Sequence, residues 1–293
     1  MKLIDQHYEI LTPKYPNSKE LTQEECVEKL LDIVYKQIEE AAKNCYQSSH
    51  TITEGSAKSF VKGLIKAGHY APLEFGSIYL TIPNSDYTTI LKWLGDNELW
   101  KYSRARNDSE FIYITTTYRV IIEYDNAENN LMEDLNRYLT PPTSKHILRK
   151  TVKLTTNRQV MGEITRHRKA SFCIESTRFN NYSKDELVFI KPNWLDLEGA
   201  DFDIDTSRMI YGNTLSIIEK QYNALIRAGW KPQQAASILP NSTKCTIYMG
   251  AYEDDWDYIF RLRTSIIAET GKPHPQMSEL MDKMYKDFTQ ETK

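Results

Sequence analysis

A short stretch of the chain concentrates side chains that bind anions. It reads Arg166-His167-Arg168-Lys169-Ala170-Ser171-Phe172-Cys173-Ile174-Glu175-Ser176-Thr177-Arg178-Phe179. Arginine offers a rigid fork of donors that matches two phosphate oxygens at once. Arg166 and Arg168 cannot share one helix face, so at a helix end they could point to two different anions. Ser176, Thr177 and Arg178 suit a second phosphate or a pyrimidine edge. The alternative is a solvated basic helix end that offsets the helix dipole.

The same stretch holds two side chains that resemble nucleophiles. Cys173 follows His167 closely enough to suggest a Cys–His dyad. We interpret Cys173 instead as a small buried thiol. Ser176 has no obvious base within its own segment, so we interpret it as a ligand-binding hydroxyl.

Composition narrows the class of protein. The 293 residues include 37 basic and 40 acidic ones, a formal charge of −3, which argues against a protein that coats nucleic acid or anionic membrane. No apolar run reaches the ~18–20 residues that cross a bilayer, and the N-terminus has no signal-peptide core. Four separated cysteines fit a reducing cytoplasm, and no His or carboxylate spacing suggests a metal site.

Apolar periodicity, together with capping, Gly and Pro residues, predicts the helices and strands that must position these residues. Thr22 and Glu25 form a capping box for a helix that runs to Cys45. Further helices are expected over 53–67, 86–100, 157–169, 206–228 and 254–269, with a short one from Pro232. Strands are expected over 75–82, 112–124, 150–155, 188–190 and 244–252, and residues 171–182 as extended or looped chain.

These elements mix without a strict βαβ rhythm, which predicts an α+β fold with mixed helices and a central, mostly antiparallel sheet. We interpret Pro141-Pro142 as a loop, so residues 1–293 are expected to form a single domain. The helix over 206–228 is expected to bury one apolar side. That side consists of Ile210, Ile217, Ile218, Leu225 and Ile226.

The basic stretch resembles the signature of flavin-dependent thymidylate synthases: Arg-His-Arg, two residues, Ser, four residues, Ser, one residue, Arg, aromatic. Phe179 stands where Tyr is more usual, and Cys173 where Asn is common. The Glu-Ser-Thr-Arg-aromatic version resembles a subgroup associated with phages and their bacterial hosts. Four outer blocks resemble the family in order along the chain: Ala41–Ser48, Gly68–Phe75, Leu239–Thr243 and Leu262-Arg263.

The resemblance implies an enzyme that reductively methylates dUMP to dTMP. Methylenetetrahydrofolate donates the carbon, and FAD reduced by NADPH supplies the hydride. It also implies a homotetramer with FAD at a subunit interface, in the cytoplasm of a bacterium or a phage-infected host. The flavin carries the redox chemistry, so no enzyme nucleophile is required.

The resemblance also assigns roles to residues. The cofactor side comprises His69, Glu74, Arg166, His167 and Arg168, with Arg166 at the junction of flavin and nucleotide. The dUMP side comprises Glu163, Arg166, Glu175, Ser176, Thr177, Arg178 and Arg263. Arg263 grips the uracil edge, where its charge stabilises negative charge on the pyrimidine, and His69 lies at the flavin.

Two of these assignments carry alternatives. Glu74 holds a ribityl or ribose hydroxyl, or orients His69. Glu163 lies near the nucleotide and could pair with Arg166 along the helix.

Three departures from the family stand out. Ala236 or Ser237 replaces an arginine that helps bind the dUMP phosphate. Tyr252, Glu253 and Asp254 occupy a stretch where Asn and Arg touch FAD, and a negative cluster there is unfavourable unless it faces elsewhere. Residues 84–150 are longer than in compact members, which suggests a subgroup elaboration over the active-site mouth.

Two rival functions remain open from the sequence. One is a folate-dependent relative that forms a hydroxymethyl group on a pyrimidine deoxynucleotide. The other is a non-enzymatic module that holds nucleotides or single-stranded nucleic acid with the basic stretch and exposed tyrosines. The net acidity and the single basic cluster count against the second.

Overall fold

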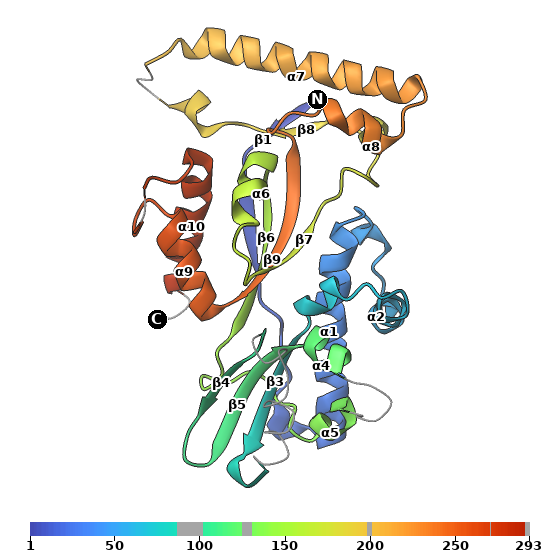
Figure 1. The fold of residues 1–293 in the computed structure, drawn as a ribbon, viewed down its shortest axis with the longest axis vertical. Helices are drawn as coiled ribbons and strands as arrows, with labels where there is room; N and C mark the ends of the chain where they lie inside the picture. Colours follow the sequence, from blue (N-terminus) through green and yellow to red (C-terminus); the bar gives the residue numbers. More distant parts are fainter. Residues whose placement is uncertain (87–101, 125–130, 198–200, 270, 291–293) are drawn as a thin grey trace.

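The computed structural model describes residues 1–86, 102–124, 131–197, 201–269 and 271–290. Its centre is a four-stranded antiparallel sheet of order β2-β6-β9-β7 (Figure 1). The strands are β2 (His7–Leu11), β6 (Arg149–Asn157), β7 (Ser171–Ile174) and β9 (Lys244–Tyr252). The predicted α+β fold with a mostly antiparallel central sheet is confirmed.

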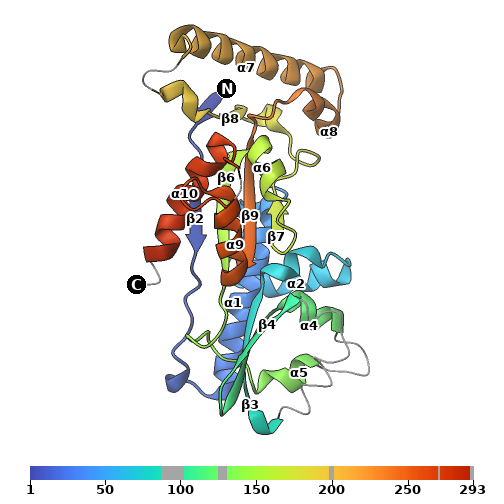
Figure 2. The ribbon, with the colours of Figure 1, turned by 60° about the vertical axis from the view of Figure 1, so that its left-hand side comes forward.

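Side-chain alternation along β6 and β9 gives the central sheet two different faces. One face packs against α6 (Arg158–Ile164), α9 (Glu253–Arg263) and α10 (Pro275–Gln290), and its core includes Val152, Ile247 and Trp256. The other face meets the C-terminal half of α1 (Gln23–Asn44) and η3 (Ala71–Phe75). Figures 1 and 2 show α9 and α10 on one flank of the sheet and α1 on the other.

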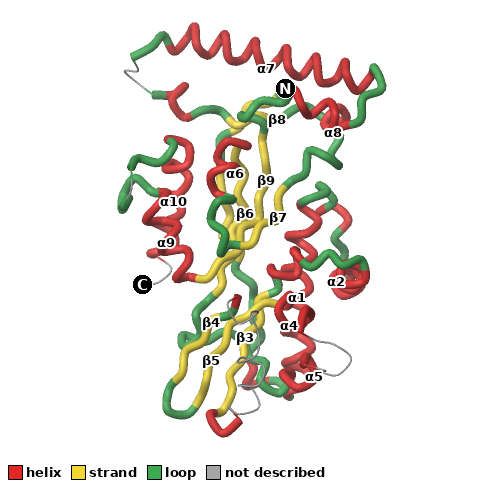
Figure 3. Tube along the Cα trace, in the orientation of Figure 1, coloured by secondary structure: helices red, strands yellow, loops and turns green. Residues whose placement is uncertain are grey.

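A second, three-stranded sheet of order β3-β5-β4 lies beyond one end of the central sheet (Figure 3). Its strands are β3 (Ser77–Pro83), β4 (Arg104–Asn107) and β5 (Phe111–Thr117). Nearby helices are α2 (Ser56–Lys66), α4 (Tyr118–Tyr124) and α5 (Leu131–Asn136). The described part of 84–150 thus builds much of a separate hydrophobic core, to which α1 contributes Val34 and Ile38. The single-domain expectation stays a prediction.

The long helix α7 (Ile204–Arg227) lies across the opposite end of the molecule (Figure 1). Beneath it are the parallel pair β1 (Lys2–Ile4) and β8 (Val188–Ile190), and α8 (Pro232–Ala235). Besides η3, the described residues form the 3-10 helices η1 (Ser18–Glu20), η2 (Ser49–Thr51), η4 (Asn84–Asp86), η6 (Tyr182–Lys184), η7 (Asn193–Asp196) and η8 (Ala236–Ile238). None of the described helices combines the length and apolar character that crossing a bilayer requires.

The predicted apolar side of α7 is wrong in part. Ile210 and Ile217 are 58% and 57% exposed, whereas Leu215 and Tyr222 are buried. The helix contacts the rest of the chain along a narrow stripe, to which Ile218, Leu225 and Ile226 contribute. An apolar face of α7 therefore remains open in the single chain.

Most other predicted elements are confirmed with shifted ends. The capping box of Thr22 and Glu25 is present. The strand predicted over 112–124 is wrong in its second half, because α4 begins at Tyr118, whose N–H donates to the Gly76 carbonyl. Burial of Tyr118 and Ile121 in the second core outweighs the β propensity of the run.

Other differences lie in element lengths and in elements that were not expected. The helix expected over 254–269 ends at Arg263, and the one over 157–169 ends at Ile164. The strands β1 and β2 and the helix α10 were not predicted. The helix expected over 86–100 lies almost wholly outside the described residues.

The close approach of Gly76, between η3 and β3, to α1 gives a stability prediction. A Cβ on Gly76 would lie 2.7 Å from Ile38 Cδ1 and 2.7 Å from Val34 Cγ1, both in the core. We expect Gly76→Ala to lower the free energy of unfolding by about 1–3 kcal/mol, because a packed core has no room for the methyl group. Urea unfolding measures it. Gly63→Ala in α2, where no atom lies within 4 Å, is the control and should be neutral or stabilising. Equal effects of the two changes would contradict the prediction.

Candidate active site

A cavity of about 860 Å³ lies where the second sheet meets the turn after α6. Its lining is unusually rich in charge. The cationic side chains are Arg104, Arg119, Arg149, Arg168 and Lys169, and the acidic ones are Glu74, Glu123, Asp254 and Asp255. Two predicted site residues, Glu74 and Arg168, therefore face the same space. A cavity of this size accommodates a cofactor-sized ligand.

The acidic cluster at the start of α9 is neutralised from the second sheet. Arg104 Nε lies 3.0 Å from Asp254 Oδ2, and its Nη2 lies 2.8 Å from Asp255 Oδ2. Lys169 Nζ approaches Asp255 Oδ1 at 3.5 Å. Of the two carboxylates in the stretch that departs from the family, Asp254 pairs with Arg104, and Glu253 lies 3.5 Å from Arg106 Nη2. A negative ligand in the cavity therefore does not meet them unpaired.

Tyr252, the other departure in this stretch, is a fixed wall of the cavity. The guanidinium carbons of Arg104 and Arg149 lie 4.6 and 5.3 Å from the centroid of its buried ring. The hydroxyl donates to the Tyr102 carbonyl at 2.7 Å. Burial raises the pKa of Tyr252 to about 12, so the hydroxyl stays a protonated donor at neutral pH.

The basic signature forms the turn between α6 and β7. Asn157 caps α6 by accepting from the Val160 N–H at 2.8 Å, and the helix ends at Ile164, before the signature begins. β7 then pairs with β9, which sets Ser171 opposite Gly250. This turn directs Arg168 to the cavity and leaves Arg166 exposed.

Three predicted residues form one cluster beside that turn. Arg263 Nε donates to His167 Nε2 at 3.0 Å, Nη1 to the Glu163 carboxylate at 3.3 Å, and Nη2 to the Glu163 carbonyl at 3.2 Å. The expected pairing of Glu163 with Arg166 is wrong, because α6 ends between them and Arg263 reaches Glu163 instead. Burial, and to a lesser degree the charge of Arg263, lowers the pKa of His167 to about 4.

Glu175 is buried and fully engaged within the protein. Its carboxylate accepts from Gln47, Tyr182, the Thr246 N–H and Lys244. The Lys244 ammonium lies 2.7 Å from Oε2 and balances the charge. Any effect of Glu175 on a substrate would therefore pass through the loop that follows it.

That loop carries the predicted nucleotide-binding group. The Ser176 N–H donates to the Cys45 carbonyl at 3.0 Å, which ties the loop to the end of α1. Arg178 is exposed, and its Nε donates to Gln233 Oε1 at 3.2 Å. The Phe179 ring packs on Tyr46, with centroids 5.2 Å apart. Arg178 therefore has donors left to offer a ligand.

The outer block around His69 divides between two environments. His69 is exposed after α2, while Glu74 lies in the cavity and accepts hydrogen bonds from Ser171 Oγ and, at 2.6 Å, from Arg119 Nη1. These contacts give Glu74 partners other than His69. Phe75, which replaces the family's second His, is buried against the central sheet.

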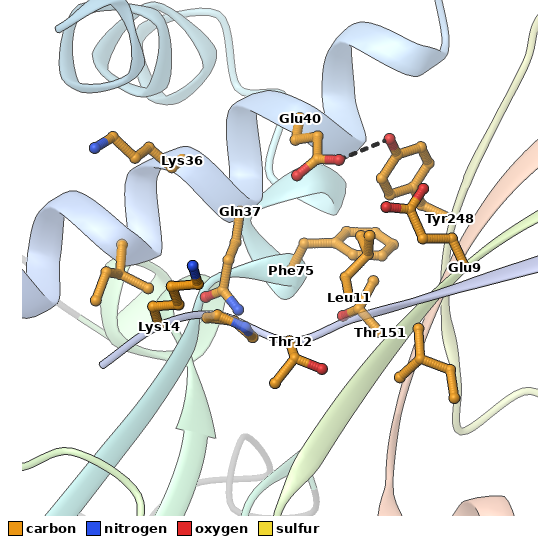
Figure 4. A pocket seen from close by; sticks show the side chains of 13 residues that line it. Glu9, Leu11, Thr12, Lys14, Lys36, Gln37, Glu40, Phe75, Thr151 and Tyr248 are labelled. Atoms are coloured by element: carbon orange, nitrogen blue, oxygen red, sulfur yellow. Dashed lines mark hydrogen bonds between the residues drawn. The ribbon is translucent and has the colours of Figure 1, made fainter. Parts of the chain in front are cut away.

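A second cavity, of about 590 Å³, opens between β2 and α1 (Figure 4). Phe75 and Leu11 line it, and the Tyr248 hydroxyl donates to Glu40 at 3.0 Å at its edge. Its lining includes none of the predicted site residues. Phe75 lines this cavity, whereas its neighbour Glu74 lines the larger one.

Cys173 is buried beside another thiol. The hydrogen bond with Cys45, together with burial, raises the pKa of Cys173 well above its usual value, which favours the buried-thiol interpretation over a reactive dyad. His167 is instead bonded to Arg263. In the described ranges, no three His, Cys, Asp or Glu side chains converge as metal ligands.

Sequence reasoning missed three arginines of the cavity. Arg149 was left just outside a predicted strand that in fact begins there, and Arg104 and Arg119 lie in the segment set aside as an elaboration. Of the three, only Arg149 could have been found from the sequence. It alternates with the apolar positions Val152 and Leu154 of the strand, so its side chain points to the opposite face of the sheet.

Comparison with known proteins gives a family. The family model described as "Thymidylate synthase complementing protein" matches residues 112–292. A flavin-dependent thymidylate synthase of Haloarcula marismortui is 27% identical over 111 residues, covering 32% of this chain and 45% of that protein. A probable flavin-dependent thymidylate synthase of Mycobacterium phage D29 is 26% identical over 156 residues, covering 48% and 65%. The matches thus span less than two thirds of either relative.

Solved structures of the UMP/dUMP methylase PolB from Streptomyces cacaoi show a weak likeness. The complex with 5-Br dUMP covers 99% of this chain and 93% of its own, with 13% identity and a TM-score of 0.45. The complex with 5-Br UMP covers 99% and 92%, with 14% identity and the same TM-score. At this level the likeness carries no inference about ligands.

The His167–Arg263 contact gives a pH prediction. Because the folded-state pKa is lowered to about 4 from 6.5, the stability present at neutral pH is lost as pH falls from about 6.5 to 4. His167→Gln has no titrating group at this position and does not lose that stability. The unfolding free energy of wild type minus that of His167→Gln should therefore fall by about 2 kcal/mol between pH 7 and pH 5.

Urea unfolding at both pH values measures this difference. His146, whose pKa burial also lowers, is present in both proteins, so its contribution cancels. Parallel pH dependences for the two proteins would show that His167 does not titrate this way.

Proposed function

The chain belongs to the family of thymidylate synthase complementing proteins, and from that premise we propose that it is a flavin-dependent thymidylate synthase. The proposed reaction converts dUMP to dTMP, with methylenetetrahydrofolate as carbon donor and NADPH as reductant of FAD. One observation carries the proposal: the family's Arg-His-Arg turn presents Arg168 to a large cavity lined by arginines.

The residues of this cavity fit a flavin dinucleotide. A pyrophosphate needs convergent cationic donors, and Arg168 supplies them at the wall beside Lys169, which also approaches Asp255. Arg104 already compensates Asp254 and Asp255, so those carboxylates do not oppose a negative ligand. Glu74 offers carboxylate oxygens to hydroxyl groups of the ligand.

The loop after β7 is the proposed binding site of the dUMP phosphate. Ser176 and Thr177 offer hydroxyls, and the exposed fork of Arg178 offers charge-assisted donors. Arg166, exposed on the preceding turn, would lie at the junction of flavin and nucleotide. Glu175 and its donors hold the start of this loop in place.

When bound, the flavin supplies hydride and takes part in transfer of the carbon unit. The chain's own residues bind, orient and polarise the reactants. Arg263 is proposed to stabilise negative charge on the pyrimidine. Its fork is held by Glu163 and by neutral His167, which fixes the direction of the guanidinium without adding a second positive charge.

We propose a homotetramer with sites shared between subunits, working in the cytoplasm. The lining of the large cavity includes neither Arg263 nor residues 176–178, and assembly would allow groups from different subunits to meet. The four cysteines are free thiols, consistent with a reducing compartment.

The test is an anaerobic half-reaction. Purified protein supplemented with FAD is reduced with NADPH, and methylenetetrahydrofolate is then added with and without dUMP. Flavin reoxidation that requires both, with dTMP identified by mass spectrometry, supports the synthase. A hydroxymethyl product would support the related folate-dependent enzyme of the same family in place of the synthase. Failure to bind FAD rejects the proposal and favours a nucleotide or nucleic-acid binder.

Arg178→Ala should lower kcat/KM for dUMP by about a hundredfold or more, because a charge-assisted contact to the nucleotide is lost. Flavin content should remain near wild type. Tritium release from 5-tritiated dUMP measures turnover, and Arg137→Ala, at an exposed arginine directly after α5, is the control. Wild-type release by Arg178→Ala would show that the nucleotide lies elsewhere.

The open face of α7 gives a prediction about assembly. Met209, Ile210 and Ile217 are each more than half exposed, an apolar surface that a subunit contact would bury. We expect the Ile210→Asp, Ile217→Asp double variant to be a smaller species than the wild-type tetramer in size-exclusion chromatography with light scattering. Lys58→Asp on α2 is the control. An unchanged tetramer in the double variant would exclude α7 as a subunit contact.

A further inference from the structure

A chain of hydrogen bonds connects α4 to the basic signature through the cavity. Arg119 Nη1, from the first turn of α4, donates to Glu74 Oε1 at 2.6 Å. Ser171 Oγ donates to the other Glu74 oxygen and accepts from Arg149 Nη2 at 2.6 Å. Glu74 is thereby held from two sides, by the second sheet's helix and by the first residue of β7.

Arg119 is itself fixed before it reaches Glu74. Its Nε and Nη2 donate to Glu123 Oε1 at 3.0 and 2.9 Å, a pairing of residues one helical turn apart. Two of the three nitrogens are therefore bound on α4, and Nη1 is left to contact Glu74. A planar guanidinium held in this way fixes the orientation of the carboxylate that it meets.

The position of the pair favours an effect on a ligand over a purely structural one. The side chains of Arg119 and Glu74 are 34% and 30% exposed, and both line the cavity that contains Arg168. The neighbouring Phe75 has no polar atom and lines the other cavity (Figure 4). Because Glu74 is paired with Arg119, the positive partner of this carboxylate in the larger cavity comes from α4.

We propose that Arg119 is a positioning residue of the flavin site, which acts by holding the Glu74 carboxylate against Ser171. In that orientation the remaining lone pairs of Glu74 accept hydrogen bonds from hydroxyl groups of the ribityl chain or ribose. The inference rests on the proposed function, and it gives α4, within 84–150, a role in cofactor binding.

A double-mutant cycle tests whether Arg119 acts through Glu74. FAD dissociation constants are measured by fluorescence for wild type, Arg119→Ala, Glu74→Ala and the double variant. Each single change should weaken binding by about tenfold, the worth of one charge-assisted hydrogen bond. The double variant should be no weaker than Glu74→Ala alone, since Glu123 still holds Arg119 when Glu74 is removed.

Two further variants separate positioning from general damage. Arg119→Lys keeps the charge but lacks the planar fork that Glu123 holds, so it should recover only a small part of the affinity. Arg106 lies in β4 of the second sheet and is not part of the cavity lining, so Arg106→Ala should bind FAD as wild type does. The visible absorption bands of bound flavin should shift equally in Arg119→Ala and Glu74→Ala and stay unchanged in Arg106→Ala. If Arg119→Ala fails to fold, Arg119→Gln, which keeps the stem, replaces it throughout the cycle.

The outcomes that overturn the inference are distinct from failure of the proposed function. Multiplicative losses in the double variant would mean that Arg119 contacts the ligand itself or acts independently of Glu74. Wild-type affinity in Arg119→Ala would mean that Glu74 needs no such partner. A wild-type protein that binds no FAD rejects the proposed function, and the inference with it, before any variant is compared.

Discussion

The pairing of β6 with β9 is the constraint on which the site depends. Its register sets Arg149 opposite Tyr252 at one end and Asn157 opposite Lys244 at the other. The first pair forms the wall of the large cavity, while Asn157 caps α6 and Lys244 neutralises Glu175. A shift of one residue would turn each of these side chains to the opposite face. One ladder therefore positions groups that bear on both proposed ligands.

Charge balance in the cavity depends on the second sheet and on α4. Arg104 compensates two carboxylates of α9, and Arg119 meets Glu74 and Glu123. Each pairing joins groups from different parts of the fold, except that of Arg119 with Glu123 within α4. Because internal pairs satisfy most of the fixed charges, Arg168 can contribute its charge to a ligand. Arg104 and Arg119, both from the segment 84–150, thus set the charge of the cavity.

Local patterns predicted much of this fold. The capping box at Thr22 and the strand over 244–252 match the structure, because both are set by nearby residues. The run over 112–124 did not, since Tyr118 turns into α4 to bury its ring against α1. Burial against a distant helix is a long-range effect that neither propensity nor periodicity contains. Similarly, Ile210 looked like a core residue, although whether a helix face is covered depends on what lies beside it.

For the site, the sequence supplied residue types and the fold supplied partners. The signature identified Arg168 and Arg178, yet Glu163 pairs with Arg263, a hundred residues further on, because α6 ends before Arg166. The same reasoning applies to Asp254. In the sequence, Asp254 is a negative charge at a place where the family binds a phosphate-bearing cofactor. In the folded chain it is bound to Arg104, an arginine of the second sheet. A departure in one segment is thus compensated by another segment, and neither is interpretable alone.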